Sequence, residues 1–171
     1  MLFTVKRILA KGVFFRKMII RNSVKGIIIK GNKLLVAEME NNGTYYTLPG
    51  GKQRPDELIF DTLKREMAEE AGYDIEPKEI MFIRETFEEG DENHRVEFMV
   101  LCEIKGEIKN NVFEYDEYQV GTKWLNIDNI SAEPLYPLEL RKLIKNFYLG
   151  KSSDVYQGVM NQRSVSFGSN N

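Results

Sequence analysis

Hydrophobic and polar residues alternate along several stretches of the chain, and this alternation predicts β-strands. Aliphatic runs at residues 26–29 and 34–37 flank Gly31-Asn32, a pair that favours a tight hairpin turn. The runs EIMFIRETFEE and HRVEFMVLCEI, separated by the polar GDEN turn, predict two further strands, and QVGTKWL predicts a short one. The strands are therefore expected to build a β-sheet.

A central helix is predicted to begin at residues 55–56, because a proline and an acidic residue both suit a first helical turn. Its buried stripe comes from apolar side chains that recur every four residues, at Ile59, Leu63 and Met67. Gly72 is the expected C-cap, because glycine readily adopts the left-handed conformation that ends many helices.

A second helix is predicted over residues 134–150, where Leu140, Ile144 and Phe147 keep helical spacing and Gly150 ends the pattern. Strands combined with one central and one terminal helix are typical of an α+β fold. We therefore expect an α/β/α sandwich.

The length and composition fit one globular domain. The chain has 171 residues, of which 42% are hydrophobic and 29% charged. We place the domain at residues 18–150, with an N-terminal extension of unclear role at 1–17 and a flexible C-terminal tail at 151–171, which we expect to be loose or to dock only weakly. The extension is interpreted as an extra strand, an amphipathic arm or the consequence of an alternative start at Met18.

The net charge limits which partners are expected, and the cysteine content bears on the cellular compartment. The net charge of −2 provides no general attraction to nucleic acid or to an anionic membrane. Basic residues interrupt the apolar runs near the start, so we expect neither a membrane span nor a secretory signal. Cys102 is the single cysteine and His94 the single histidine, which excludes a zinc site of the Cys/His kind. A lone cysteine favours a cytoplasmic location.

The central helix carries glutamates at 57, 66, 69 and 70 around Arg65. In a regular helix Glu66, Glu69 and Glu70 fan over about 100° of one face. Such like charges repel, so this face is either solvated or bound to a cation. Magnesium prefers oxygen ligands, which three carboxylates beside a glycine loop supply. Glu57 lies about half a turn away, and either pairs with Arg65 or reaches the metal from the first turn.

The stretch from residue 51 to residue 73 resembles the Nudix box, G-x5-E-x7-R-E-U-x-E-E-x-G-U, in which U is a bulky apolar residue. Every fixed position of the pattern is matched, by Gly51, Glu57, Arg65, Glu66, Glu69, Glu70 and Gly72. Tyr73 is aromatic where an aliphatic residue is usual, which bears on packing at the helix end and not on the metals.

The resemblance extends over roughly residues 23–148. GIIIKGNKLLVAEM is similar to the opening hairpin of the family, and YYTLPGG is similar to the lead-in to the box. DEYQVGTKWLNID is similar to the late acidic loop and strand, and a final helix follows. The resemblance implies a Nudix-type α/β/α sandwich, with a mixed β-sheet, a central catalytic helix and a C-terminal helix.

The resemblance also implies a reaction, namely metal-dependent hydrolysis of the pyrophosphate bond in a nucleoside diphosphate linked to another moiety. Arg65 would orient Glu57 and its neighbours through bidentate hydrogen bonds. Glu66 would be either a metal ligand or the base for the attacking water. The implied ligands of Mg²⁺ or Mn²⁺ are Gly51 through its carbonyl, Glu66, Glu69 and Glu70.

Three further candidates lie outside the box. Glu117 belongs to an acidic loop, and relatives of this kind imply that an acid there reaches the metals or acts as base; a plain polar loop is the alternative. Tyr46 is a candidate for stacking on a base, with core packing as the alternative. Arg95 follows the GDEN turn and is a candidate for binding phosphate or ribose, unless it is a plain strand end.

Two classes of function fit these observations. One is a hydrolase acting on ADP-ribose or another nucleotide sugar, a nucleoside triphosphate or a dinucleoside polyphosphate. The other is a Nudix-like nucleotide sensor or regulator without turnover, although such modules usually lack one or more box glutamates. We expect a small nucleotide partner and no membrane, nucleic acid only as a capped RNA end, and a homodimer as one assembly that extra N-terminal strands would serve.

Overall fold

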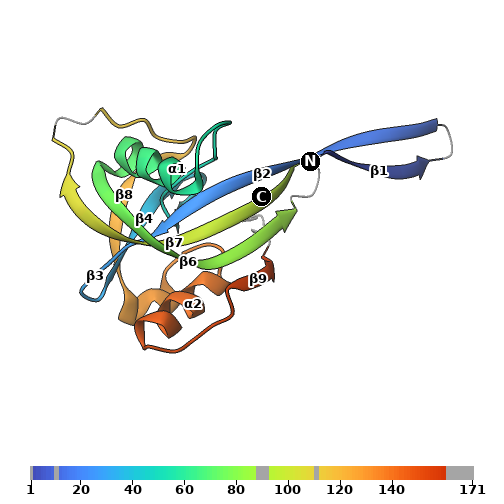
Figure 1. The fold of residues 1–171 in the computed structure, drawn as a ribbon. Helices are drawn as coiled ribbons and strands as arrows, with labels where there is room; N and C mark the ends of the chain where they lie inside the picture. The colour runs from blue at the N-terminus through green and yellow to red at the C-terminus, as the bar shows by residue number, and fades with distance from the viewer. Residues whose placement is uncertain (1, 10–11, 88–92, 110–111, 161–171) are drawn as a thin grey trace.

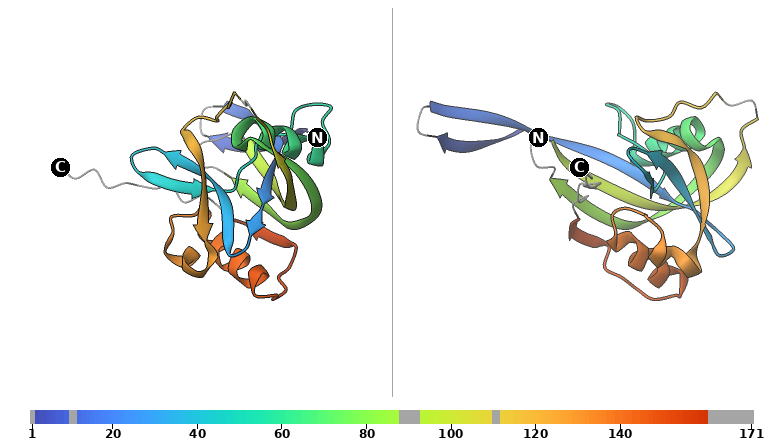
Figure 2. Two further views of the ribbon diagram at one scale, coloured as in Figure 1. Left: turned by 90° about the vertical axis from the view of Figure 1, so that its left-hand side faces the viewer. Right: turned by 180° about the vertical axis from the view of Figure 1, so that it is seen from behind.

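Two β-sheets lie between helix α1 (Ile59–Glu66) on one side and helix α2 (Glu139–Tyr148) on the other, as Figures 1 and 2 show. The computed structural model describes residues 2–9, 12–87, 93–109 and 112–160. Within them, one sheet has the strand order β1 (Leu2–Leu9), β2 (Gly12–Ile27), β7 (Asn93–Glu107), β6 (Tyr73–Phe87) and β9 (Tyr156–Val159). In the other, β4 (Lys33–Glu40) pairs with β3 (Ile29–Lys30), β5 (Thr44–Thr47) and β8 (Gln119–Asn126). The predicted α+β sandwich with a mixed sheet is confirmed.

The larger sheet combines parallel and antiparallel strands. Strands β2 and β7 run parallel, with Ser23 beside Glu97, whereas β7 and β6 run antiparallel, with Glu97 beside Arg84. These three residues, far apart in sequence, therefore form one row across the sheet.

The predicted hairpin at the start of the domain is present. Strands β3 and β4 are antiparallel, and Ile29 pairs with Leu34. Gly31 lies in the turn with a φ of 62°, which glycine adopts without steric cost. The other predicted strands are also present as β6, β7 and β8, whereas most of the GDEN turn lies outside the described residues.

The central helix begins later than predicted and changes its type before it ends. Residues 55–56 form a turn in which Asp56 has a φ of 68°, a value that an α-helix excludes. After α1 the chain continues as the π-helical turn η1 (Met67–Ala71), and Gly72 closes it with a φ of 68°, as expected. Because a π-helical turn bonds i to i+5, Glu69 and Glu70 do not lie on the regular arc that we predicted.

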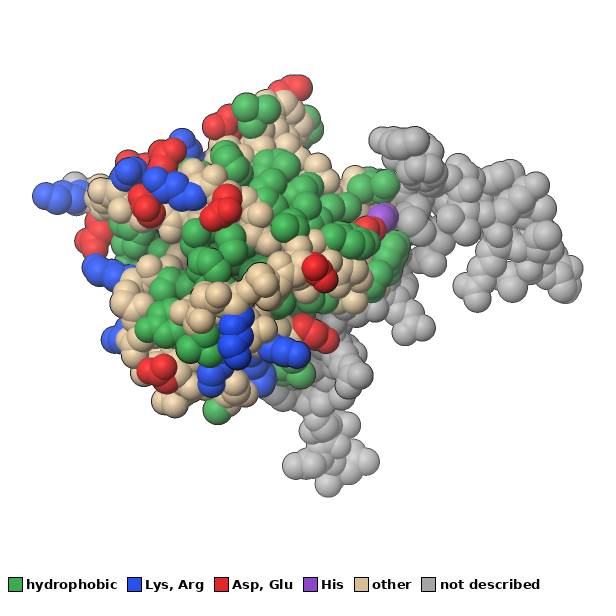
Figure 3. Space-filling view, turned by 60° about the horizontal axis from the view of Figure 1, so that its bottom comes forward, with side chains coloured by type: hydrophobic (Ala, Val, Ile, Leu, Met, Phe, Trp, Pro, Cys, Tyr) green, Lys and Arg blue, Asp and Glu red, His purple; other side chains and the backbone are tan. Residues whose placement is uncertain are grey.

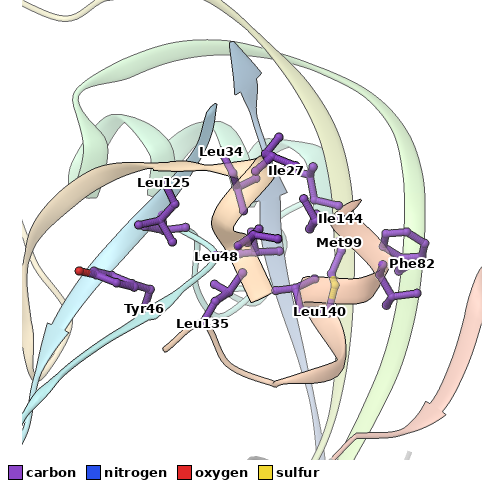
Figure 4. Packing of buried hydrophobic residues seen from close by; sticks show 14 of the residues in the cluster. Ile27, Leu34, Tyr46, Leu48, Phe82, Met99, Leu125, Leu135, Leu140 and Ile144 are labelled. Atoms are coloured by element: carbon purple, nitrogen blue, oxygen red, sulfur yellow. The ribbon is translucent and has the colours of Figure 1, made fainter. Parts of the chain in front are cut away.

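Alternate side chains of the strands point to opposite faces, and each face meets one helix. On β4, Leu35 packs against Leu63 and Met67 on the α1 side. Its neighbours Leu34 and Val36 belong to the cluster on the α2 side, shown in Figure 4. This second cluster also includes Ile27, Tyr46, Leu48, Phe82, Met99, Leu125, Leu135, Leu140 and Ile144.

The surface around α2 is basic in part, whereas the central helix on the opposite side of the sheets is acidic. Lys and Arg side chains gather on part of this face beside hydrophobic ones, as Figure 3 shows. A shallow groove there is lined by Arg141, Lys142, Lys145 and Lys151, among others. No helix in the described ranges combines the length and the apolar content needed to cross a membrane.

The structure describes most of the N-terminal extension and part of the C-terminal tail. Of the three interpretations of residues 1–17, the structure favours the extra strand, because β1 pairs with β2 in a hairpin that projects from the body (Figure 1). Residues 151–160 are not a loose tail. Strand β9 pairs with β6, Met160 is buried in the core, and the Glu85 carbonyl accepts the Met160 N–H at 3.0 Å. Residues 161–171 lie outside the described residues.

Candidate active site

Arg65 organises the acidic end of the central helix. Its Nε and Nη2 donate to Glu57 Oε1 and Oε2 at 2.6 and 3.0 Å, so the predicted bidentate contact is present. Its Nη1 donates to Glu66 Oε1 at 2.7 Å and to Glu69 Oε2 at 2.9 Å. One guanidinium therefore holds three of the box glutamates in fixed positions.

Glu57 is an anchor for Arg65. Besides the guanidinium fork, its Oε2 accepts from Thr62 Oγ1 at 3.0 Å and from the Arg54 N–H at 3.1 Å. The hydrogen bonds from Arg65, more than any other contact, lower the pKa of Glu57 to about 2. Of the two roles left open for Glu57, the structure supports pairing with Arg65.

Glu70 joins the π-helical turn to the glycine loop. Its side chain is buried, and its Oε2 accepts from the Gly50 N–H at 3.2 Å. Burial raises the pKa of Glu70 to about 7, although the charge of Lys25 and the Gly50 hydrogen bond oppose this shift. Lys25 Nζ in turn donates to the Gly50 carbonyl. A buried acid and a cation thus meet at the loop.

Glu66 lies directly against Gly51. A Cβ atom built on Gly51 would lie 2.5 Å from Glu66 Cδ, so only glycine lets the carboxylate occupy this place. Burial raises the pKa of Glu66; Arg65 lowers it, and the charges of Asp116 and Glu69 raise it further. The Glu66 carboxylate is therefore buried among other acids, where a cation would stabilise it.

Gly51→Ala is expected to abolish most turnover with little change in the temperature of unfolding. The added methyl group meets the end of a flexible side chain, which can move away at small cost to the fold, but the Glu66 carboxylate is then displaced. Gly121→Ala is the matched control, because nothing lies within 4 Å of a Cβ at that position. Equal activity of the two variants and the parent would contradict this role of Gly51.

The acid that reaches the site from the late loop is Asp116 and not the expected Glu117. Asp116 lines the cavity beside Gly51, and its charge raises the pKa of both Glu66 and Glu70. The carboxylate of Glu117 instead hydrogen-bonds the Tyr118 hydroxyl and raises the pKa of that group. The loop is held against η1, because Glu114 N donates to the Glu69 carbonyl at 3.0 Å.

A cavity between the two sheets opens beside these carboxylates. Arg95 lines it, as the predicted role in binding phosphate or ribose requires. The cavity is bounded by cations, acids and apolar side chains, namely Ser23, Lys25, Met39, Tyr45, Thr47, Leu48, Gly51, Lys52, Arg84, Arg95, Glu97, Met99, Asp116, Tyr136, Pro137 and Leu140.

Tyr46 does not face this cavity, which corrects its prediction as a stacking residue. It is 5% exposed and belongs to the core, and Lys123 Nζ donates to its hydroxyl at 2.7 Å. Because side chains alternate along β5, its neighbours Tyr45 and Thr47 line the cavity instead. The aromatic wall is therefore Tyr45, whose ring meets that of Tyr136 edge to face at 6.1 Å.

The donors at this site suit a hard divalent cation. Carboxylate oxygens of Glu66, Glu69 and Glu70 and the Gly51 carbonyl are the ligand type that Mg²⁺ and Mn²⁺ prefer. In the part of the chain that the structure describes, no three His, Cys, Asp or Glu side chains already converge on one point. Arg65 lies between Glu66 and Glu69 instead. These oxygen donors therefore suit Mg²⁺ or Mn²⁺, and the binding of such an ion at this site is a proposal.

Comparison with known proteins agrees with the fold and the box. A family model of the NUDIX domain matches residues 20–147. The human protein named 8-oxo-dGDP phosphatase NUDT18 is 32% identical over 88 residues, which are 52% of this chain and 25% of that protein. This chain thus spans about a quarter of the length of that relative.

Solved structures of similar fold cover most of the chain. A NUDIX hydrolase from Nitrosomonas europaea has a TM-score of 0.65 at 20% identity, over 79% of this chain and 93% of that one. The ORF135 protein of E. coli has a TM-score of 0.64 at 21% identity, over 80% of this chain and 96% of that one. At such identities the likeness shows the fold alone.

Proposed function

This chain belongs to the NUDIX domain family; on that premise we propose that it is a hydrolase that cleaves the pyrophosphate bond of a nucleoside diphosphate linked to another moiety, with Mg²⁺ or Mn²⁺ as cofactor. The observation that carries this proposal is the group of glutamates that Arg65 holds beside the cavity. Glu66 is buried against Gly51, and Gly51 lines the cavity together with Lys25, Lys52 and Arg95. This combination suits a phosphate substrate and its counter-ions.

The residues of this chain divide into distinct proposed roles. Glu66, Glu69, Glu70 and the Gly51 carbonyl would hold the divalent cation, which when bound would neutralise phosphate charge and lower the pKa of a bound water. Lys52 and Arg95 line the same cavity and would orient phosphate oxygens.

Proton transfer is assigned to the acids nearest the cavity. Glu66 would be a metal ligand or take the proton of the attacking water, and Asp116 replaces Glu117 as the second acid. Arg65 and Glu57 would act through these carboxylates by fixing their positions. No covalent nucleophile is needed, because water attack suffices for this reaction.

The experiment that tests this function is a panel of substrates with millimolar Mg²⁺ and, separately, with EDTA. The panel contains ADP-ribose, nucleotide sugars, nucleoside triphosphates and dinucleoside polyphosphates. It also contains 8-oxo-dGDP, because the human relative is named for that substrate. We expect at least one compound to be cleaved to a nucleoside monophosphate with Mg²⁺, and none with EDTA.

A nucleotide sensor without turnover is the second candidate. Tight binding of one panel member in calorimetry, together with no product at neutral or alkaline pH, would replace the hydrolase by the sensor. The complete set of box glutamates favours the hydrolase, because Glu66 and Glu70 are buried and a buried carboxylate is costly without a compensating partner such as a cation.

A further inference from the structure

A row of polar side chains crosses the floor of the cavity. Ser23 on β2, Glu97 on β7 and Arg84 on β6 are neighbours in the strand register, and all three line the cavity. Their exposed fractions are 4%, 4% and 3%. Two residues further along the same face, Met99 and Phe82 belong to the apolar core. The row therefore borders the hydrophobic core on one side, and on the other side it is followed by the polar row of Arg21, Arg95 and Thr86.

Arg84 and Glu97 form a buried ion pair within this row. Arg84 Nε donates to Glu97 Oε2, and Arg84 Nη1 donates to the Met160 carbonyl at 2.9 Å. The guanidinium is thus fixed from two sides, by strand β7 and by the residue that follows β9. The contact from Arg84 Nε takes one of roughly four acceptor positions that a carboxylate offers. Both charged groups are held rigidly at the cavity wall.

Stability alone is a weak reason for this pair. Removing two charges from water is costly, and well-packed hydrophobic residues often serve a core equally well or better. This pair lies at a cavity whose other walls include the rings of Tyr45 and Tyr136, set at 82° to each other. Apolar and aromatic walls with a few fixed polar groups are typical of a pocket for a small ligand.

We propose that the Arg84–Glu97 pair recognises the base of the substrate and selects guanine; this inference rests on the proposed function. The Watson–Crick edge of guanine presents the acceptor O6 next to the donors N1–H and N2–H. A guanidinium beside a carboxylate presents donors next to acceptors, which is the complementary order. Tyr45 and Tyr136 supply the aromatic surface against which the base packs.

Adenine matches the pair less well. Its edge offers one donor and one acceptor, so one acceptor position of the Glu97 carboxylate would stay unpaired in a buried site. A site built to hydrogen-bond a substrate strongly rejects an analogue that leaves its polar groups unpaired. The oxidised base 8-oxoguanine keeps the guanine edge, and the pair therefore accepts it as well as guanine.

The test compares guanosine and adenosine forms of the same substrate, GTP with ATP, GDP with ADP, and the two dinucleoside tetraphosphates. The proteins are the parent, Glu97→Gln and the control Glu85→Gln, all with Mg²⁺. Glu85 lies next to Arg84 on β6 but on the opposite face, where it contacts His94 and Tyr156. The readout is the ratio of kcat/KM for guanosine over adenosine, with binding of GMP and AMP by calorimetry in parallel.

The parent is expected to prefer guanosine by about tenfold or more, the discrimination of one good paired contact. Glu97→Gln exchanges an acceptor for a donor, so the ratio should fall by about tenfold, whereas Glu85→Gln should keep it. No preference in the parent, or an equal loss on both bases in Glu97→Gln, overturns the proposal while the hydrolase stands. If the parent cleaves nothing, the proposed function fails, and GMP binding no tighter than AMP binding then overturns this inference too.

A folding failure of Glu97→Gln leaves two decisive readouts, because the preference of the parent for guanosine and its relative affinity for GMP and AMP need no variant. Thermal melts identify such a failure.

Discussion

Glu66→Gln is expected to lower kcat by at least ~10²-fold, the contribution of a single general base, while the protein still folds and binds nucleotide. Glutamine keeps the size of the side chain and accepts a hydrogen bond from Arg65 Nη1, but it removes the charge. Whether Glu66 holds the cation or takes the proton of water, that charge acts mainly in the transition state. Steady-state kinetics on the best substrate of the panel measure the loss.

Asp61→Asn is the matched control for this variant, because Asp61 is an exposed acid on the same helix α1. It should keep the turnover of the parent. An active Glu66→Gln variant would remove Glu66 from the mechanism, and a fall of similar size in Asp61→Asn would indicate a general effect of charge on the helix.

Arg65→Lys is expected to lower kcat/KM by about 10- to 100-fold, the usual cost of losing a residue that orients metal ligands. Lysine keeps the positive charge but cannot bind Glu57 through two parallel hydrogen bonds and also reach Glu66 and Glu69. The carboxylates should then lose their fixed positions, and the apparent affinity for Mg²⁺ should fall together with turnover.

Arg141→Lys is the control for Arg65→Lys. It tests whether the exchange of any arginine for lysine lowers turnover, or only the exchange at position 65. Arg141 donates to the carbonyls of Leu135 and Ser131 near α2, far from the box in sequence. Circular dichroism should show a folded protein in both variants. Unchanged turnover and Mg²⁺ dependence in Arg65→Lys would mean that Arg65 is not needed to position the glutamates.

Hydrophobic periodicity predicted the strands and the helices because it reports directly on which face of an element is buried. Leu63 on α1 and Met67 at the start of η1 are buried as expected, and Gly72 caps η1. The late start of α1 and the π-helical turn are not visible in such a pattern. Local geometry decides them, such as the φ of 68° at Asp56 and the packing of η1 against the glycine loop.

The errors in the candidate site arose from the direction in which side chains point. An aromatic residue beside the box was expected to stack on substrate, but alternation along β5 places Tyr46 in the core and Tyr45 in the cavity. In the acidic loop, Asp116 lines the cavity and Glu117 does not, and the chain turns directly afterwards at Tyr118, where φ is 69°. The motif fixes the spacing of residues 51–73, but it does not fix the direction of side chains in the strands and loops outside that segment.

The sequence alone could not predict contacts between strands that lie far apart along the chain. Ser23, Glu97 and Arg84 meet only because β2, β7 and β6 are neighbours in one register, and Arg84 also needs the carbonyl of Met160. The segment 151–160 lacked a clear period, since β9 is short and pairs with one edge of the sheet. The homodimer, the cytoplasmic location and the identity of the cation stay predictions.

Hydrolysis in H₂¹⁸O tests the central claim, that water attacks a phosphorus atom of a pyrophosphate at the Arg65-centred group of glutamates. The best substrate of the panel is cleaved with Mg²⁺ by the parent, and the products are examined by mass spectrometry. The account predicts one ¹⁸O atom in one of the two phosphate products, and no such product from Glu66→Gln on the same time scale. Label on a sugar carbon, or tight binding of the substrate without any labelled phosphate, would contradict it.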